Sequence, residues 1–141
     1  MEETRNDTLK NATSSELARA AAAILIEKKA LDVRVYELLE QSPITDYYVN
    51  VTGRSSTQVA SLADELAYKI SLCGREAARM EGKRGNSWIL VDYGDVIVNV
   101  FDRESRDFYN LDRLMPENSE IDISDVVAEV DKKFDINNRE V

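Results

Sequence analysis

The chain has 141 residues, of which 43% are hydrophobic, and its 27 acidic and 18 basic side chains give a net charge of −9. This length suits a single domain that buries its own core. The acidic balance argues against non-specific binding to nucleic acid, which needs clustered cations, so we expect little direct nucleic-acid binding.

Histidine is absent and Cys73 is the one cysteine. The sequence therefore excludes Ser-His and Cys-His nucleophile pairs, a zinc site of the usual type and an internal disulfide. No stretch approaches the roughly 18 apolar residues of a membrane span, and the acidic, polar start lacks the features of a signal or transit peptide. We expect a cytoplasmic protein that uses no metal or cofactor.

A helix followed by two strands is predicted for the first third of the chain. Residues 1–12 are polar and predict a flexible N-terminal tail. Thr13 opens a capping box for an Ala-rich helix that runs to about residue 29. Alternating apolar side chains predict one strand over residues 32–36, where charge points outward as at a sheet edge, and another over residues 44–52.

A second helix is predicted from residue 55 to about residue 72. Ser55 and Gln58 have the spacing of another capping box, and Gly74 suits the C-terminal cap. Residues 80–87 are polar, locally basic and contain two glycines. This composition predicts a loop.

Two apolar runs flank a short polar turn and predict a β-hairpin at the centre of the sheet. The runs are residues 88–91 and 96–101, and the turn between them contains Gly94, which takes positive φ without steric cost. The second run has almost no polar residue on either face, so we expect both of its faces to be covered. Asn99 is its exception.

The chain is less regular beyond the hairpin. Apolar residues between 108 and 115 predict a short helix or turn that packs back on the domain, residues 116–120 a linker, and residues 121–134 a last helix. The order α-β-β-α-β-β-α predicts an α+β fold with a single mixed β-sheet and helices packed on it. We therefore expect one domain over residues 13–115 and a C-terminal extension with a helix over residues 116–141.

Residues 53–56 lead from a strand into a helix N-terminus, where free amides can receive an anion. Nucleotidyl-transferring enzymes place a Gly-Ser pair in such a position and add strand-borne carboxylates that hold divalent metal. No Asp-x-Asp occurs on the adjacent predicted strands, and the nearest pair, Asp102 and Glu104, lies in a charged turn. Ordinary helix capping is the simpler interpretation, and a nucleotide-binding or nucleotidyltransferase-type enzyme is the alternative function.

The hairpin turn carries Asp92 and Asp95 on either side of Tyr93 and Gly94. Two neighbouring carboxylates can raise one another's pKa for acid/base chemistry, but acids around a glycine are also ordinary turn formers. We favour the interpretation as turn-forming acids, because acid/base catalysis would also need a pocket and the sequence gives no sign of one.

Trp88 is the only tryptophan, and strand alternation places it on one face with Leu90 and Asp92. Tyr93 follows at the tip of the hairpin. Trp and Tyr are enriched at interface hot spots because they combine area, rigidity and a polar group. From these residues alone, a contact residue and a core residue at the start of a strand are equally good interpretations of Trp88.

Several motifs occur together in a recognisable order. They are residues 46–49, 52–56 and 63–65, then Glu81-Gly82, Trp88-Ile89-Leu90-Val91-Asp92-Tyr93-Gly94-Asp95 with the strand to Phe101, and residues 106–114. Together these motifs span about residues 15 to 115, and they resemble the ribosomal silencing factor (Iojap) family.

The resemblance implies a small α+β domain with a nucleotidyltransferase-like outline but without catalysis, so we expect no enzyme. It implies binding to the large ribosomal subunit through the ribosomal protein numbered fourteen. The bound factor would sterically block joining with the small subunit and so repress translation. The family also implies a role in large-subunit biogenesis, and free copies that pair as homodimers.

The partner-facing surface of the family matches the tryptophan and the hairpin turn. With Leu90 on the same strand face, the predicted contact residues are Trp88, Leu90, Asp92, Tyr93, Gly94 and Asp95. An acidic turn suits a basic ribosomal protein and would speed the encounter.

Two positions depart from the family pattern. Asn99 stands where many relatives have His, and Met115 stands where the family often has Trp. The second departure bears on the C-terminal part of the predicted interface. Asn99 matters little if that position is only a packed polar residue.

Overall fold

The computed structural model describes residues 5–139, and their side chains up to Lys133. Within this range the chain forms one sheet, four α-helices and two short 3-10 helices. The helices are α1 (Ser14–Glu27), α2 (Ser56–Leu72), α3 (Arg103–Tyr109), α4 (Ser124–Arg139), η1 (Leu39–Gln41) and η2 (Leu111–Leu114). The strands are β1 (Leu31–Glu37), β2 (Tyr47–Gly53), β3 (Arg79–Glu81), β4 (Trp88–Asp92) and β5 (Val96–Asp102).

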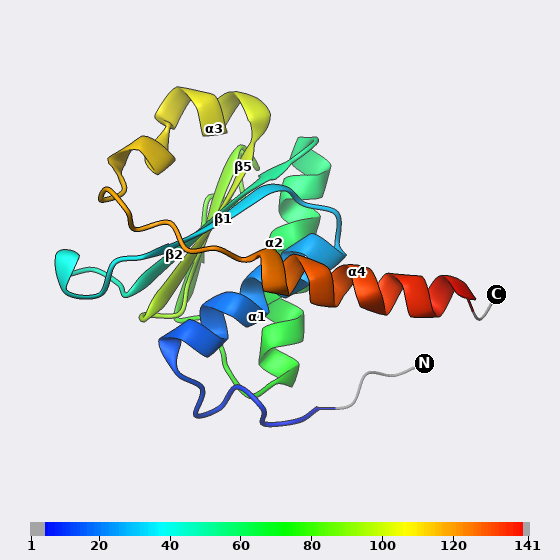
Figure 1. The fold of residues 1–141 in the computed structure, drawn as a ribbon. Helices are drawn as coiled ribbons and strands as arrows, with labels where there is room; N and C mark the ends of the chain where they lie inside the picture. The colour runs from blue at the N-terminus through cyan, green and yellow to red at the C-terminus, as the bar shows by residue number, and fades with distance from the viewer. Residues whose placement is uncertain (1–4, 140–141) are drawn as a thin grey trace.

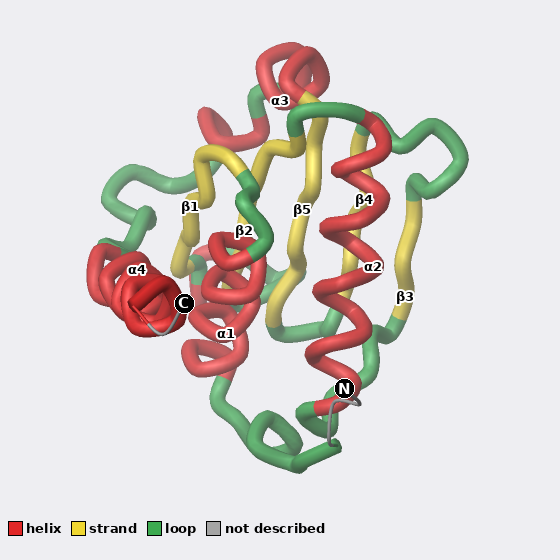
Figure 2. Tube along the Cα trace, turned by 90° about the vertical axis from the view of Figure 1, so that its right-hand side faces the viewer, coloured by secondary structure: helices red, strands yellow, loops and turns green. Residues whose placement is uncertain are grey.

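The five strands form a single mixed sheet in the order β1-β2-β5-β4-β3. β2 and β5 are parallel, and the other neighbouring pairs are antiparallel. Helices α1 and α2 lie side by side over one face of the sheet, while α3 lies at one end of it (Figures 1 and 2). The predicted α+β class with one mixed sheet is confirmed. β3 includes the first two residues of the predicted loop over residues 80–87.

The predicted hairpin is β4 and β5, and β5 is the central strand. All of β5 except Asp102 is buried. One face of the strand joins the core beneath α1 and α2, and the opposite face carries Ile97, Asn99 and Phe101. Both faces are therefore covered, as expected from an apolar run with no alternation.

The first two predicted helices carry side-chain caps at their N-termini. Thr13 Oγ1 accepts from the Glu16 amide at 3.1 Å, and Glu16 Oε1 accepts from the Thr13 amide at 2.9 Å. Ser55 Oγ caps the Gln58 amide at 3.1 Å. The predicted reciprocal bond is shifted by one residue, because Gln58 Oε1 accepts from the Arg54 amide instead.

The described part of the predicted flexible tail, residues 5–12, is attached to the domain. The Asn6 amide donates to Leu72 O at 2.7 Å, and the Leu9 amide donates to Cys73 O at 2.8 Å. Leu9 is 9% exposed and belongs to the core cluster. One apolar residue and two backbone bonds to the end of α2 are enough to attach this polar segment.

The C-terminal extension also packs on the domain. The Glu37 amide donates to Ser119 O at 2.8 Å and the Ile121 amide donates to Val35 O at 2.9 Å, so the predicted linker pairs with the edge of β1. Helix α4 lies against α1 and buries two valines, Val126 and Val130. It begins at Ser124 rather than at residue 121, and it continues beyond residue 134 to Arg139.

Among the described residues, no helix is both long and apolar enough to cross a membrane.

Candidate functional site

The face of the sheet opposite α1 and α2 is only partly covered. Trp88, Leu90 and Asp92 alternate along β4 and lie on this open face, while Ile89 and Val91 between them are fully buried on the helix side. α3 covers the end of the open face near the start of β4, where Tyr109 meets Trp88, and η2 contacts β1 and β2 through Asp112. The predicted contact residues of β4 are therefore brought together on one accessible surface.

Trp88 is half-buried and has both structural and surface character. Its indole Nε1 donates to Asn99 Oδ1 at 3.0 Å. The indole lies 4.9 Å from the ring of Phe101 and 4.8 Å from the ring of Tyr109, measured between ring centroids. Trp88 thus packs on β5 while it remains partly accessible, and its role as a contact residue stays a prediction.

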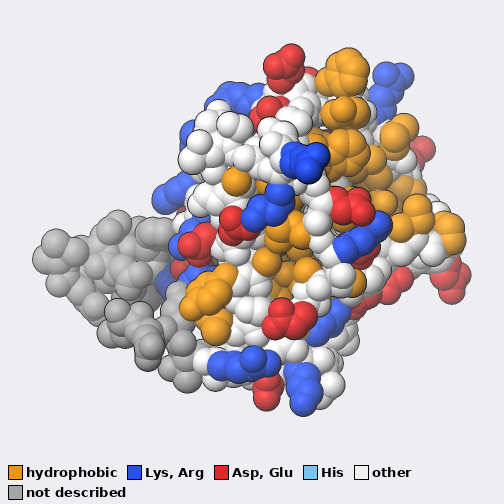
Figure 3. Space-filling view, turned by 180° about the vertical axis from the view of Figure 1, so that it is seen from behind, with side chains coloured by type: hydrophobic (Ala, Val, Ile, Leu, Met, Phe, Trp, Pro, Cys, Tyr) orange, Lys and Arg blue, Asp and Glu red, His pale blue; other side chains and the backbone are white. Residues whose placement is uncertain are grey.

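The largest exposed apolar side chains near Trp88 come from α3. Phe108 is 79% exposed and Tyr109 is 51% exposed, and their rings meet edge to face at 5.1 Å. In Figure 3 hydrophobic side chains run from the top of the molecule, where α3 lies, down its right-hand side. We call Trp88, Leu90, Phe108 and Tyr109 the aromatic surface.

The prediction that the segment 108–115 packs back on the domain is therefore wrong in part. Leu114 is 72% exposed as well, so three of its apolar residues face solvent. α3 has only seven residues, and Arg106 is the one that is buried against the domain. Phe108 and Tyr109 of the same helix are exposed.

A shallow hollow of about 280 Å³ adjoins the aromatic surface. It is lined by Glu81, Gly82, Trp88 and Leu90, at the edge between β3 and β4. Gly82 is required there, because an added Cβ would lie 2.0 Å from the carbonyl oxygen of Trp88. The hollow extends the aromatic surface toward the sheet edge and offers space for one inserted side chain.

The hairpin turn is acidic in sequence, but each of its carboxylates is paired with arginine. Asp92 Oδ2 accepts from Arg79 Nε at 2.9 Å, and its Oδ1 accepts from the Gly94 amide at 2.7 Å. Asp95 Oδ1 accepts from Arg75 Nη2 at 2.9 Å. These contacts make the two acids turn-forming and ion-pairing groups, with different partners, rather than a shared acid/base pair.

Tyr93 does not lie at an exposed tip. Its side chain is 7% exposed and belongs to the core cluster on the helix face, whereas Gly94 beside it is exposed with φ +90°. Burial raises the pKa of its phenol well above the usual range. The alternation that placed Trp88 on one face continues through Ile89, Val91 and Tyr93 on the other. Tyr93 is thus a core residue that supports the turn from inside.

A chain of polar side chains crosses the open face from Trp88. Asn99 Oδ1 accepts from the indole, Asn99 Nδ2 donates to Asn50 Oδ1 at 3.1 Å, and Asn50 Nδ2 donates to Asp112 Oδ1 at 3.2 Å. Asn50 and Asn99 are 0% and 1% exposed. We call these four residues, Trp88-Asn99-Asn50-Asp112, the polar relay. It was not predicted, since its members lie on β4, β5, β2 and η2.

Asp112 is the most heavily bonded group of the relay. Arg106 donates to it twice, from Nε at 2.7 Å and from Nη2 at 3.1 Å, and the Tyr36 hydroxyl donates at 2.8 Å. Burial by itself raises the pKa of the Asp112 carboxyl, but the hydrogen bonds from Arg106, Tyr36 and Asn50 outweigh it and the pKa is lowered. Asp112 is therefore an ionised anchor at neutral pH.

Met115 lines a different hollow, with Tyr36 and Pro116 over β1. β1 and β4 are separated by two strands, so this residue lies on the far side of η2 from Trp88. The departure at position 115 therefore concerns the β1 side of the face. Asn99 is a packed polar residue, and it is also the acceptor of the Trp88 indole.

The strand–helix junction at residues 53–56 is occupied by the chain's own groups. Ser55 and Gln58 cap its amides, and Arg54 Nη1 donates to Lys29 O at 2.7 Å. Asp102 Oδ1 caps the Ser105 amide at 2.8 Å. Over residues 5–133, no three His, Cys, Asp or Glu side chains are grouped so as to hold a metal ion. Nothing in this arrangement favours nucleotidyl transfer over helix capping.

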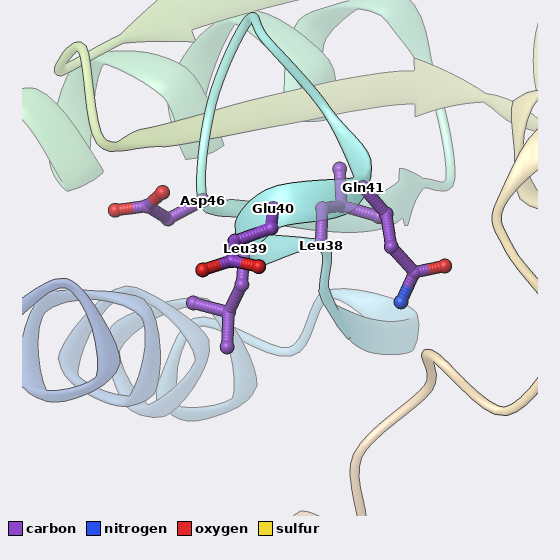
Figure 4. A pocket seen from close by; sticks show the side chains of 5 residues that line it. All are labelled: Leu38, Leu39, Glu40, Gln41 and Asp46. Atoms are coloured by element: carbon purple, nitrogen blue, oxygen red, sulfur yellow. The ribbon is translucent and has the colours of Figure 1, made fainter.

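Another hollow, of about 530 Å³, lies at η1. Its lining consists of Leu38, Leu39, Glu40, Gln41 and Asp46. Figure 4 shows that these side chains spread in different directions instead of converging on one point. The hollow presents two acids and an amide without a nucleophile or cation, so it does not define a chemical site.

Comparison with known proteins gives a consistent result. The family model described as "Ribosomal silencing factor during starvation" matches residues 11–140, a range that includes α4. A Zymomonas mobilis protein named Ribosomal silencing factor RsfS is 37% identical over 108 residues, covering 74% of this chain and 81% of that protein. The mouse protein named Mitochondrial assembly of ribosomal large subunit protein 1 is 27% identical over 95 residues, covering 65% of this chain and 42% of that protein.

A solved structure agrees with these sequence matches. The crystal structure of a Chromobacterium violaceum protein superposes with a TM-score of 0.71 at 28% identity, covering 73% of this chain and 86% of that chain. The family model extends over far more than half of the residues. The chain therefore belongs to the ribosomal silencing factor family.

Proposed function

We propose that this chain binds the large ribosomal subunit through the ribosomal protein numbered fourteen and blocks joining with the small subunit. Translation is thereby repressed without any catalytic step. The observation that carries the proposal is the aromatic surface, which exposes Phe108 and Tyr109 beside a half-buried Trp88. Family membership supports the ribosome as partner, and the name of the mouse relative refers to the large subunit.

Exposed aromatic groups on a rigid base suit a protein interface. Rings that pack on a sheet lose little conformational entropy on binding, and such residues carry most of the energy of typical interfaces. The polar relay and the edge-to-face contact of Phe108 with Tyr109 hold these rings in place. A factor that blocks subunit joining needs only affinity for the large subunit and enough bulk to exclude the small one. The aromatic surface supplies the affinity.

Charge supports a basic partner. The net charge of −9 favours encounter with a cationic ribosomal protein and disfavours contact with rRNA phosphates. Because Asp92 and Asp95 are paired with Arg79 and Arg75, the steering comes from the charge of the whole chain rather than from the turn alone. Binding should weaken as the salt concentration rises.

The test is co-sedimentation with purified large subunits at several salt concentrations, using two matched tyrosine variants. Tyr109 is 51% exposed on α3, and Tyr68 is 52% exposed on α2. Tyr109→Ala should weaken pelleting by about tenfold in affinity or more, whereas Tyr68→Ala should pellet like the wild type. Equal pelleting of both variants at the wild-type level would exclude the aromatic surface as the contact.

Blocking is tested separately from binding. Large and small subunits are mixed with a saturating amount of the protein and separated on a sucrose gradient. The wild-type protein should reduce the fraction of joined ribosomes, and the Tyr109→Ala variant should leave joining intact. If the fraction of joined ribosomes is unchanged although the large subunits are saturated with the protein, the protein binds the large subunit but does not block joining.

We extend the proposal to a cytoplasmic site of action, to a supporting role in large-subunit biogenesis and to a homodimer in the free state, as the family resemblance implies. Fractionation of cells, subunit profiles of a deletion strain and sedimentation equilibrium of the free protein test these three statements.

A further inference from the structure

The polar relay has a direction that its two ends impose. At one end the indole Nε1–H of Trp88 can only donate, and at the other end the ionised carboxylate of Asp112 can only accept. The two residues between them, Asn99 and Asn50, have amides that can each be placed two ways round. Only one of the four combinations pairs every group in the chain.

The requirement runs from Asp112 outward. Its Oδ1 demands a donor, so Asn50 turns Nδ2 toward it at 3.2 Å and leaves Oδ1 facing Asn99. Asn99 must then donate Nδ2 to that oxygen at 3.1 Å, which leaves its own Oδ1 for the indole at 3.0 Å. Because both amides are at least 99% buried, water is not at hand to repair a reversed amide.

Asp112 is itself held in place from two further sides. Arg106 donates from Nε and Nη2, and its guanidinium is anchored through Nη1 to Thr52 Oγ1 at 3.0 Å. The Tyr36 hydroxyl on β1 donates to the same carboxylate. α3, which carries Arg106, also carries Tyr109 against the indole. The segment 103–114 thus reaches Trp88 by ring contact on one side and by the relay on the other.

We propose that Asp112 is a positioning residue, which fixes the orientation of the Trp88 indole through Asn50 and Asn99 and so presets the aromatic surface for its partner. The part of this inference that concerns the partner rests on the proposed ribosome binding. The part that concerns the indole does not, because it is a property of the free protein. The two can therefore fail separately.

The indole is directly observable, since Trp88 is the only tryptophan and its Nε1–H gives a single side-chain signal in a proton–nitrogen correlation spectrum of the full-length protein. Asp112→Asn leaves one amide oxygen for donors from Arg106, Tyr36 and Asn50. We expect the indole signal to move by more than its line width and its exchange with solvent to rise about fivefold or more. Asp112→Asn with the wild-type signal and exchange rate would overturn the proposal.

Asp32→Asn is the matched control. Asp32 Oδ2 lies 3.6 Å from Arg106 Nη2, and its side chain is 53% exposed, so this variant removes the same charge from the same arginine outside the relay. Its indole signal should stay at the wild-type position. If Asp32→Asn moves the signal as far as Asp112→Asn does, the effect is one of charge and the relay is refuted.

Asn50→Leu tests the relay without touching the Arg106–Asp112 pair, and it replaces Asp112→Asn if that variant does not fold. It should also move the indole signal and speed its exchange, and an unchanged signal would refute the relay. In the ribosome assay both relay variants should bind about three- to tenfold more weakly than the wild type, with Asp32→Asn unaffected. If Trp88→Ala binds like the wild type, the aromatic surface is not the contact with the ribosome, while the indole measurements still decide the positioning role.

Discussion

The ring of Tyr109 at the end of α3 lies 4.8 Å from the indole of Trp88 at the start of β4. These residues are 21 positions apart in sequence, and the contact joins the two parts of the aromatic surface. A partner that touches one ring therefore meets a surface whose shape depends on both.

Removal of either ring should weaken binding, and the two losses should not add. We expect Trp88→Ala to cost about 2 kcal/mol or more of binding free energy to large subunits, as for other interface hot spots. In the double variant with Tyr109→Ala the loss should fall short of the sum by about 0.5 kcal/mol or more, because the rings are in contact. Equilibrium titration of labelled protein with large subunits measures all three, and strict additivity would show that the rings act independently.

Asp112 should contribute stability that disappears in acid. Its pKa is lowered from the ordinary value of 3.8, so its stabilising effect is fully present above that value and is lost as the pH falls through the lower native pKa. Asp112→Asn should therefore be less stable than the wild type at pH 7, and the difference should shrink below about pH 4. Denaturant unfolding across this range measures it.

Asp64→Asn is the control for that experiment. Asp64 pairs with Lys83 on the surface, where the two side chains are 55% and 52% exposed. An exposed pair contributes little to stability, so the variant should follow the wild-type curve at every pH. A difference between Asp112→Asn and the wild type that stayed constant down to pH 2 would contradict the assignment of an ionised Asp112.

Asn99→His should turn the relay into a pH-sensitive element. A neutral imidazole can accept from Trp88 with one nitrogen and donate to Asn50 with the other, as the Asn amide does, but an imidazolium can only donate. Burial favours the neutral form, so the native pKa should lie below the unfolded value of about 6.5. The variant should lose stability between about pH 7 and pH 5 relative to the wild type, which contains no histidine.

Thermal unfolding at successive pH values tests this variant. Asn99→Leu has no titrating group and fills the same space, so it should show a constant deficit over the same range. A pH-independent deficit in Asn99→His as well would mean that the imidazole does not take the place of the amide.

The C-terminal segment should protect the sheet edge at β1. Ser119 and Ile121 pair with the backbone of Glu37 and Val35. A chain that ends at Met115 should expose these groups and self-associate, since an unpaired edge strand is a template for another chain. A chain that ends at Ile123 keeps the pairing with β1 and loses only α4, so it should self-associate less than the chain that ends at Met115. Light scattering of the two chains at equal concentration measures the difference.

Much of the fold could be predicted because its signals are local. Thr13 and Ser55 mark the starts of two helices as N-caps. The apolar runs on either side of Gly94 predict the hairpin. The central place of its second strand follows because that strand is apolar on both faces. β3 was missed because three residues are too few to show a period. The attached N-terminal segment was missed because it depends on one leucine, Leu9.

For the candidate site, the sequence could predict only which residues of one strand share a face. Alternation placed Trp88, Leu90 and Asp92 together, and the same rule would have moved Tyr93 to the core had it been carried one residue further. The relay was out of reach, because Asn50 and Asp112 are 62 positions apart and meet only once the order of the strands is known. Its one sequence signal is a pair of Asn residues at otherwise apolar positions of β2 and β5.

The parallel pairing of β2 with β5 has a consequence during synthesis. Asn50 and Asn99, which lie side by side in these strands, are 49 positions apart, so β2 leaves the ribosome long before its central neighbour exists. At about 5–20 residues per second this interval lasts roughly 2 to 10 seconds. During that time Val49 and Val51, fully buried in the finished fold, can be covered only by elements made before β5, chiefly α1, β1 and then α2. The β4–β5 hairpin then closes the sheet in one late step, so the aromatic surface and the centre of the core form together.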